Sequence, residues 1–160
     1  MTALFAALRT VVVVSGFVGL WTVAAMWARR LDAVLGVLPA WTPPLGVVAA
    51  IAGAPLALTC AALFAIRGRG TPAPFDPPRA FVAFGPYRAV RNPMYVGGWL
   101  TLVGVALLVR SSGILALSLA ALIAAHLFVI LYEEPALAGK FGAPYEQYRT
   151  TVPRWIPTRH

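Results

Sequence analysis

The fold is decided by an apolar stretch that a four-residue turn divides in two. It reads MYVGGWLTLVGVALLV over residues 94–109, RSSG over 110–113 and ILALSLAALIAAHLFVILY over 114–132. Each apolar half is close to the roughly 20 residues that a helix needs to cross a bilayer. Because the polar turn is so short, the stretch predicts two antiparallel membrane helices, the first of them short.

Two upstream stretches, at about 10–28 and 45–66, have the same apolar character. Apolar residues make up 60% of the chain and charged residues 11%, whereas soluble domains have about 45–50% and about 25%. So few charges could not cover the surface of a soluble domain. We therefore predict one all-α integral membrane domain over residues 1–160, with about four transmembrane helices.

The basic residues predict how this domain is oriented. Ten of the 13 lie at the N-terminus, in the loop between the second and third spans, or after the fourth span. The other three are Arg29, Arg30 and Arg110. The positive-inside rule then places both termini in the cytoplasm. Twelve arginines against one lysine hint at a GC-rich bacterial genome, so we expect a multi-pass protein of a bacterial inner membrane.

Composition also disfavours two kinds of site. The basic residues are spread along the chain without interleaved aromatics, so we expect them to face lipid headgroups and predict no nucleic-acid partner. The chain has one cysteine and two histidines, too few for a thiolate cluster and few for a catalytic zinc, so no metal site is predicted. Cys60 lies in an apolar run and is interpreted as a packing residue.

Polar residues gather in two clusters beside the last two spans. The first is GPYRAVRNPMY, over residues 85–95, and the second runs from Glu133 and Glu134 to Pro157. Both lie at the open end of the predicted hairpin, so we expect them to be neighbours in space. Arginines and tyrosines at such positions can be ordinary interfacial anchors. On pattern alone, that interpretation stays open beside a functional one.

The end of the fourth span carries three ionisable residues, His126, Glu133 and Glu134. Paired carboxylates beside lipid need a cationic partner, for which Arg88, Arg91 or a cationic ligand could serve. Pro135 predicts that a new helix starts there, which would place both glutamates at its favourable N-terminus. His126 precedes Glu133 by seven residues and shares its helix face. It could be functional, or a neutral histidine bonded to a neighbouring helix.

Together the clusters resemble the isoprenylcysteine carboxyl methyltransferases and the related phospholipid methyltransferases. That family has Gly-x-Tyr, Arg-His-Pro-x-Tyr-x-Gly, a helical hairpin, Glu-Glu, Phe-Gly-x-x-Tyr-x-x-Tyr and Val-Pro-Arg. The chain has the corresponding segments Gly85–Tyr87, Arg91–Gly97, Glu133–Glu134, Phe141–Tyr148 and Val152–Arg154. The resemblance covers about residues 79–157, and the order and spacing of the pieces make it specific.

The resemblance implies S-adenosylmethionine as cofactor, in a cytoplasm-facing pocket that the C-terminal segment caps. It implies the following cofactor-binding residues: Phe81, Val82, Tyr87, Asn92, Pro93, Met94, Tyr95 and Glu133. The candidates for a catalytic role are Arg91, Arg154 and Glu134. Arg91 adjoins the cofactor motif. Arg154 lies in a segment that can fold over the pocket, so we expect it to contact the methyl acceptor.

Two departures from the family pattern bear on the acceptor. Asn92 stands where the family usually has histidine, and asparagine cannot relay a proton. The stretch from Phe128 to Leu131 is apolar, whereas the carboxyl methyltransferases carry an arginine there that binds the acceptor carboxylate. A prenylcysteine acceptor is therefore disfavoured. We expect instead a lipid-like amphiphile, with its tail in the membrane lipid and a small nucleophilic head at the rim.

Two rival interpretations remain. Membrane sterol reductases end in a related pattern, so an NADPH-dependent reductase is an alternative, although those enzymes generally need more spans. The other is a non-catalytic membrane protein with a degenerate site.

Overall fold

The computed structural model describes residues 3–63, 66 and 83–157, and within them it contains helices, turns and irregular segments but no strand. The longer elements are α1 (Ala3–Ala28), α3 (Pro43–Leu63), α4 (Pro93–Leu108) and α5 (Ser112–Phe128). Shorter helices connect them or follow them: η1 (Arg29–Leu31), α2 (Asp32–Leu35), η3 (Gly85–Arg88), α6 (Glu134–Phe141) and α7 (Ala143–Thr151). The all-helical prediction is therefore confirmed.

Three helical stretches are long and apolar enough to cross a membrane: Val11–Leu35, Pro43–Leu63 and Ser112–Phe141. The apolar helix α4 has 16 residues, which at 1.5 Å per residue span about 24 Å, less than the roughly 30 Å of a bilayer core. The predicted shortness of this element is confirmed. Helix α1 begins at Ala3, and its stretch that could cross a membrane begins at Val11, close to the predicted start of the span near residue 10.

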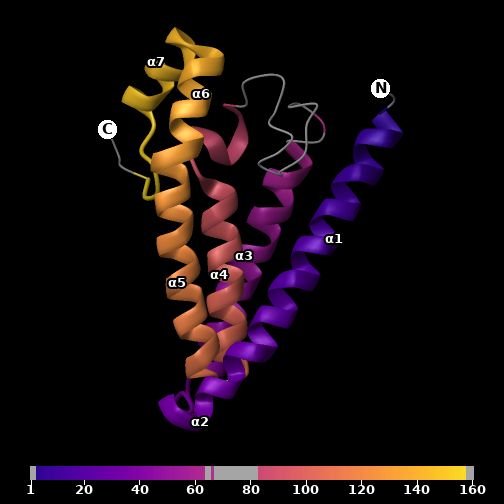
Figure 1. Ribbon diagram of the computed structural model, residues 1–160, viewed down its shortest axis with the longest axis vertical. Coiled ribbons are helices and arrows are strands. Elements are labelled where there is room, and N and C mark those ends of the chain that lie inside the picture. Colours follow the sequence, from indigo (N-terminus) through magenta and orange to yellow (C-terminus); the bar gives the residue numbers. More distant parts are fainter. Residues whose placement is uncertain (1–2, 64–65, 67–82, 158–160) are drawn as a thin grey trace.

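Helices α3 and α4 pack backbone against backbone in antiparallel directions (Figure 1). A Cβ atom added to Gly53 would lie 2.6 Å from Gly97 O, and one added to Gly104 would lie 2.7 Å from Ala50 N. Gly46 likewise approaches the backbone of Leu108. Small residues allow this close approach in lipid, where dispersion contacts rather than the hydrophobic effect hold helices together.

The turn between α4 and α5 is fixed by its own hydrogen bonds. Arg110 takes the left-handed conformation, with φ 56°. This lets its N–H bond Leu107 O while the Ser111 N–H bonds Ala106 O, the Schellman pattern that ends helices. Ser111 Oγ then caps α5 by accepting from Ile114 N at 3.1 Å. The predicted tight antiparallel hairpin is confirmed.

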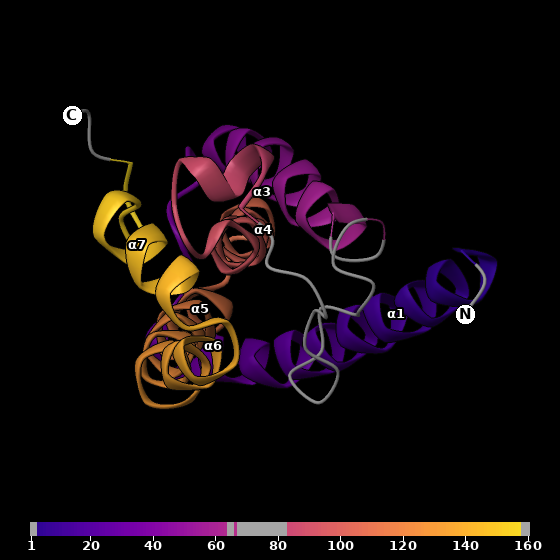
Figure 2. The same ribbon diagram turned by 90° about the horizontal axis from the view of Figure 1, so that it is seen from above.

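A carboxylate from the N-terminal part of the chain holds this turn. Asp32 Oδ1 accepts hydrogen bonds from Ser111 Oγ at 2.9 Å and from Gly113 N at 2.8 Å. Gly113 also lies directly against Ala28 O, at the end of α1. From this contact α1 leans away from the other helices, so that its N-terminal half lies apart from them (Figures 1 and 2).

At the open end of the hairpin, a five-residue π turn, Val129–Glu133, joins α5 to α6. Its characteristic bond runs from the Glu134 N–H to Val129 O, five residues back. Pro135 lacks an N–H group and its ring crowds the carbonyl four residues earlier, which disfavours an uninterrupted α-helix here. The new helix predicted at Pro135 is confirmed, and it begins at Glu134.

After α7, residues 152–157, which we call the C-terminal segment, turn back down beside the hairpin (Figure 1): Pro153 O accepts from Arg91 N, and Trp155 Nε1 donates to His126 Nδ1 of α5. Gly142, with φ 58°, makes the corner between α6 and α7. Together α6, α7 and the C-terminal segment cover the open end of the hairpin, where the two polar clusters meet.

Candidate functional site

Glu134 is the centre of an ion-pair cluster that joins three parts of the chain. Its Oε1 atom accepts from Arg91 Nη1 at 2.9 Å and from Arg154 Nε at 2.7 Å, and its Oε2 atom accepts from Arg154 Nη2 at 3.0 Å. The Glu134 side chain is 9% exposed. Arg154 thus binds the carboxylate through two parallel bonds, the strongest arrangement available to this pair.

The backbone continues this junction between the first polar cluster and the C-terminal segment. Arg91 N donates to Pro153 O at 2.8 Å, and Asn92 Nδ2 donates to Arg154 O at 3.3 Å. The Glu134 carboxylate and these two hydrogen bonds therefore hold the C-terminal segment against the residues that precede α4. The predicted meeting of the two clusters is confirmed.

The neighbouring Glu133 has a different environment. Its Oε2 atom accepts from Tyr95 Oη at 3.0 Å, and among the described residues no arginine or lysine pairs with it. The two adjacent glutamates thus have different partners: Glu134 binds two arginines, whereas Glu133 bonds the Tyr95 hydroxyl and pairs with no cation among the described residues. Arg88, another predicted partner, is exposed and pairs with neither.

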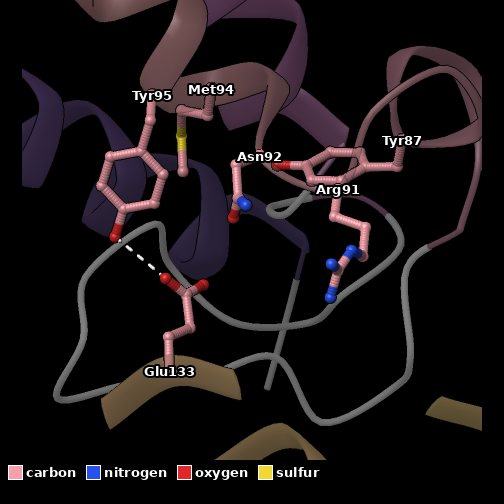
Figure 3. A pocket seen from close by; sticks show the side chains of 6 residues that line it. All are labelled: Tyr87, Arg91, Asn92, Met94, Tyr95 and Glu133. Carbon is pink, nitrogen blue, oxygen red and sulfur yellow. Dashed lines mark hydrogen bonds between the residues drawn. The ribbon is translucent and has the colours of Figure 1, made fainter. Parts of the chain in front are cut away.

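A pocket with about 200 Å³ of empty space, part of it open to solvent, lies beside Glu133. Six residues line it: Tyr87, Arg91, Asn92, Met94, Tyr95 and Glu133. Figure 3 shows Met94 and Tyr95 side by side above Glu133, with Asn92, Arg91 and Tyr87 facing them. The pocket thus joins a carboxylate, a guanidinium, two phenol rings and a thioether within one small space.

Arg91 has one donor that its protein partners leave free. Its side chain is 11% exposed, and Nη1 binds Glu134. Its Nε atom is buried and has no hydrogen-bond partner within the part of the chain that the structure describes. A buried charged donor without an acceptor is costly, so this atom marks a place where an anionic group could bind.

Two tyrosines of α7, Tyr145 and Tyr148, lie close to the site. Tyr148 Oη donates to Tyr87 O at 2.6 Å, which ties α7 to the residues before α4. Tyr145 is 2% exposed. Burial raises the pKa values of Tyr87, Tyr145 and Tyr148, because it disfavours the charged phenolate. The three therefore stay neutral at physiological pH and act as hydrogen-bonding and packing groups.

The structure groups most of the residues singled out from the sequence. Of the eight predicted cofactor-binding residues, five line the pocket: Tyr87, Asn92, Met94, Tyr95 and Glu133. Pro93 is buried at the start of α4. Phe81 and Val82 lie outside the described residues. The three residues predicted to be catalytic, Arg91, Arg154 and Glu134, form the ion-pair cluster beside the pocket.

Sequence reasoning assigned no part in the site to Trp155. Its Nε1 atom donates to His126 Nδ1 at 3.1 Å, and its ring packs edge-on against Tyr95, with 6.4 Å between ring centroids. The sequence signal that could have indicated this role is its position directly after Val152–Arg154, a segment of the family pattern. His126 thus bonds the C-terminal segment and not a neighbouring helix, the partner expected in one of its two interpretations.

Comparison of the sequence with known proteins identifies a family. The sequence model of the phospholipid methyltransferase family matches residues 45–144. No curated protein and no solved structure gives a significant match. The matched region includes all but the first two residues of α3, the α4–α5 hairpin, all six residues that line the pocket, and Glu134. Since it covers well over half of the sequence, the chain belongs to the phospholipid methyltransferase family, a family of membrane methyltransferases.

Proposed function

We propose that this protein transfers a methyl group from S-adenosylmethionine to an amphiphilic acceptor at the cytoplasmic face of a bacterial inner membrane. In this proposal α1, α3, α4 and α5 all span the bilayer, and both termini are cytoplasmic. The family match supports methyl transfer and, in general, this cofactor. The observation that carries the cofactor assignment is the carboxylate of Glu133, which faces the pocket with no cationic partner among the described residues.

The chemistry of the pocket fits the amino-acid end of the cofactor. Its ammonium suits Glu133, since a carboxylate shielded from water attracts a cation strongly. Its carboxylate suits the unpaired Nε atom of Arg91, because guanidinium groups bind carboxylates through directed hydrogen bonds. The space of about 200 Å³ suits this end rather than the whole molecule. For the adenine we keep the prediction that Phe81 and Val82 flank it.

The aromatic residues suit the charge of the sulfonium centre. Tyr87 and Tyr95 line the pocket, and the faces of aromatic rings attract cationic methyl groups. When bound, S-adenosylmethionine supplies an electrophilic methyl group for in-line displacement by a nucleophile. The residues then have to orient the reactants and exclude water. Pro93 is buried at the first position of α4. It therefore fixes where the helix begins and, with it, the positions of Met94 and Tyr95.

The C-terminal segment contributes by covering the site. Glu134 fixes it through Arg154, so that both serve the reaction by closing the pocket. Arg154 uses Nε and Nη2 for this pairing and keeps Nη1 outside it. We propose that this remaining amino group contacts the polar head of the acceptor. Asn92 binds the same segment through its amide, and since it does not titrate, it takes no proton from the acceptor.

The acceptor is proposed to enter from lipid. Leu131 is 72% exposed and Tyr132 55% exposed, so the end of the hairpin presents an apolar surface beside the polar cluster. An amphiphile there would keep its tail in the bilayer while its head reached the level of Arg154. A soluble acceptor would gain nothing from this surface.

Substitution of Glu133 tests the proposal. In detergent-purified protein we expect Glu133→Gln to weaken binding of S-adenosylhomocysteine at least thirtyfold, because losing one partner of a desolvated charge pair costs about 2–5 kcal/mol. Glu146→Gln is the matched control, since Glu146 is 46% exposed and pairs only with Arg149. Calorimetry measures both affinities. Unchanged affinity in folded Glu133→Gln, or binding of NADPH in place of the nucleoside, would refute the assignment.

A further inference from the structure

Beyond the pocket, four side chains form a continuous row from the interior of α5 to the pocket carboxylate. His126 Nδ1 accepts from Trp155 Nε1 at 3.1 Å, and the two rings lie 6.0 Å apart. The indole also meets the ring of Tyr95, with 6.4 Å between centroids and 75° between planes. Tyr95 Oη then donates to Glu133 at 3.0 Å. The row crosses four elements: α5, the C-terminal segment, α4 and the π turn.

Each contact in this row limits the orientation of the next side chain. An indole nitrogen can only donate, so the bond requires a free lone pair on His126 Nδ1. The bond fixes the rotation of the Trp155 ring, which is half-buried between α4 and α5. The edge-on contact with the indole then limits the positions open to the Tyr95 ring. Since Tyr95 provides the hydrogen bond to Glu133, the direction of that carboxylate depends on a histidine outside the pocket.

We propose that His126 and Trp155 are positioning residues: together they hold Tyr95 and thereby aim the Glu133 carboxylate at the ammonium group of the cofactor. This inference rests on the proposed function and assigns to it two residues that do not line the pocket. His126 lies seven residues before Glu133, about 10 Å away along the helix at 1.5 Å per residue. It therefore acts through Trp155 and Tyr95 and not by contact with the ligand.

A positioning role for His126 predicts a result that a purely structural role does not. His126→Phe keeps a ring of similar size but removes the acceptor. We expect it to weaken binding of S-adenosylhomocysteine about threefold to tenfold, the effect of losing one neutral hydrogen bond. An analogue of S-adenosylhomocysteine without the α-amino group should bind the variant as well as it binds the wild type. A general loosening of the fold would weaken both ligands equally.

Two further variants complete the experiment. His126→Asn places an amide oxygen near the position of Nδ1, so it should recover most of the lost affinity. Trp155→Phe should reproduce the loss seen with His126→Phe, whereas the matched control Trp41→Phe, at a 67% exposed residue, should not. Calorimetric titration of each folded variant with both ligands gives the comparison.

The outcomes separate the two proposals. Wild type that fails to bind S-adenosylhomocysteine overturns the proposed function and this inference together. Wild type that binds, with His126→Phe either unchanged or equally weakened for both ligands, overturns only the positioning role. Selective weakening for the ligand that carries the amino group, with recovery in His126→Asn, supports it.

Discussion

Replacing Glu134 by glutamine should release the C-terminal segment from the site while leaving the helices folded. The carboxylate accepts three hydrogen bonds from Arg91 and Arg154. An amide has one acceptor oxygen, no negative charge, and an NH₂ group that would face the guanidinium donors. The substitution therefore removes charge complementarity at the junction between the first polar cluster and residues 152–157.

The size of the effect follows from how far each partner is buried. Breaking a buried ion pair by removing one partner costs about 3–5 kcal/mol. The Glu134 side chain is 9% exposed and that of Arg91 11%, but that of Arg154 is 32% exposed and can regain water when released. We therefore expect the lower end of the range, about 3 kcal/mol. At 1.4 kcal/mol for each factor of ten, docking of the segment weakens about a hundredfold.

Hydrogen exchange can measure this change at one backbone bond. The Arg91 N–H donates to Pro153 O at 2.8 Å, so this amide is protected only while the C-terminal segment is docked. In Glu134→Gln its exchange should be about a hundredfold faster. Amides within α4 and α5 should keep their rates, because their bonds lie inside the helices.

Glu146→Gln serves as the control, because the exposed pair of Glu146 with Arg149 should contribute less than about 1 kcal/mol. It should change the exchange of Arg91 less than about fivefold. If Glu134→Gln folds and the Arg91 amide keeps its protection, the ion-pair cluster does not hold the segment, and our account of Glu134 is wrong.

Three other predictions concern packing, the acceptor and orientation. Gly97→Ala should destabilise the protein by about 1–3 kcal/mol in thermal unfolding, because its Cβ would lie 2.6 Å from the backbone of α3, whereas Gly98→Ala, with nothing within 4 Å, should not. Arg154→Ala should lower turnover more than cofactor affinity, while Arg91→Ala should lower both; faster methylation of a soluble, tail-free acceptor than of any amphiphile would contradict entry from lipid. A cysteine placed at Thr71 in a cysteine-free chain should react with reagents only from the cytoplasmic side, and labelling from the opposite side would reverse the orientation.

The hairpin was predictable because its signals are local. The turn at 110–113 is the polar interruption of a long apolar run, and the structure ends α4 at Leu108 and begins α5 at Ser112. The same short turn made it possible to predict that the two polar clusters meet. The first span was predicted from about residue 10, close to the apolar stretch that starts at Val11. The helix itself extends back to Ala3 through Arg9, because arginine is a good helix former.

The division of labour between the two glutamates was not predictable from the residues alone. Glu133 and Glu134 are adjacent and chemically identical, and only the family resemblance separated them, by implying cofactor binding for Glu133 and leaving Glu134 among the catalytic candidates. Which of the two binds arginine depends on the helix phase after the π turn, which is a tertiary feature. The pairing of Trp155 with His126 also joins residues 29 positions apart, and no local pattern links them.

The π turn has a consequence for how such a protein can vary. Successive residues of an α-helix point about 100° apart, so one extra residue between α5 and α6 changes the direction of everything after it. The lipid-facing pattern of α5 and the aim of the two glutamates are therefore set independently of each other. The hairpin could change in length or tilt to suit a thicker or thinner bilayer, and a gain or loss at residues 129–133 could restore the direction of the carboxylates. One irregular turn thus separates adaptation to the membrane from adaptation of the chemistry.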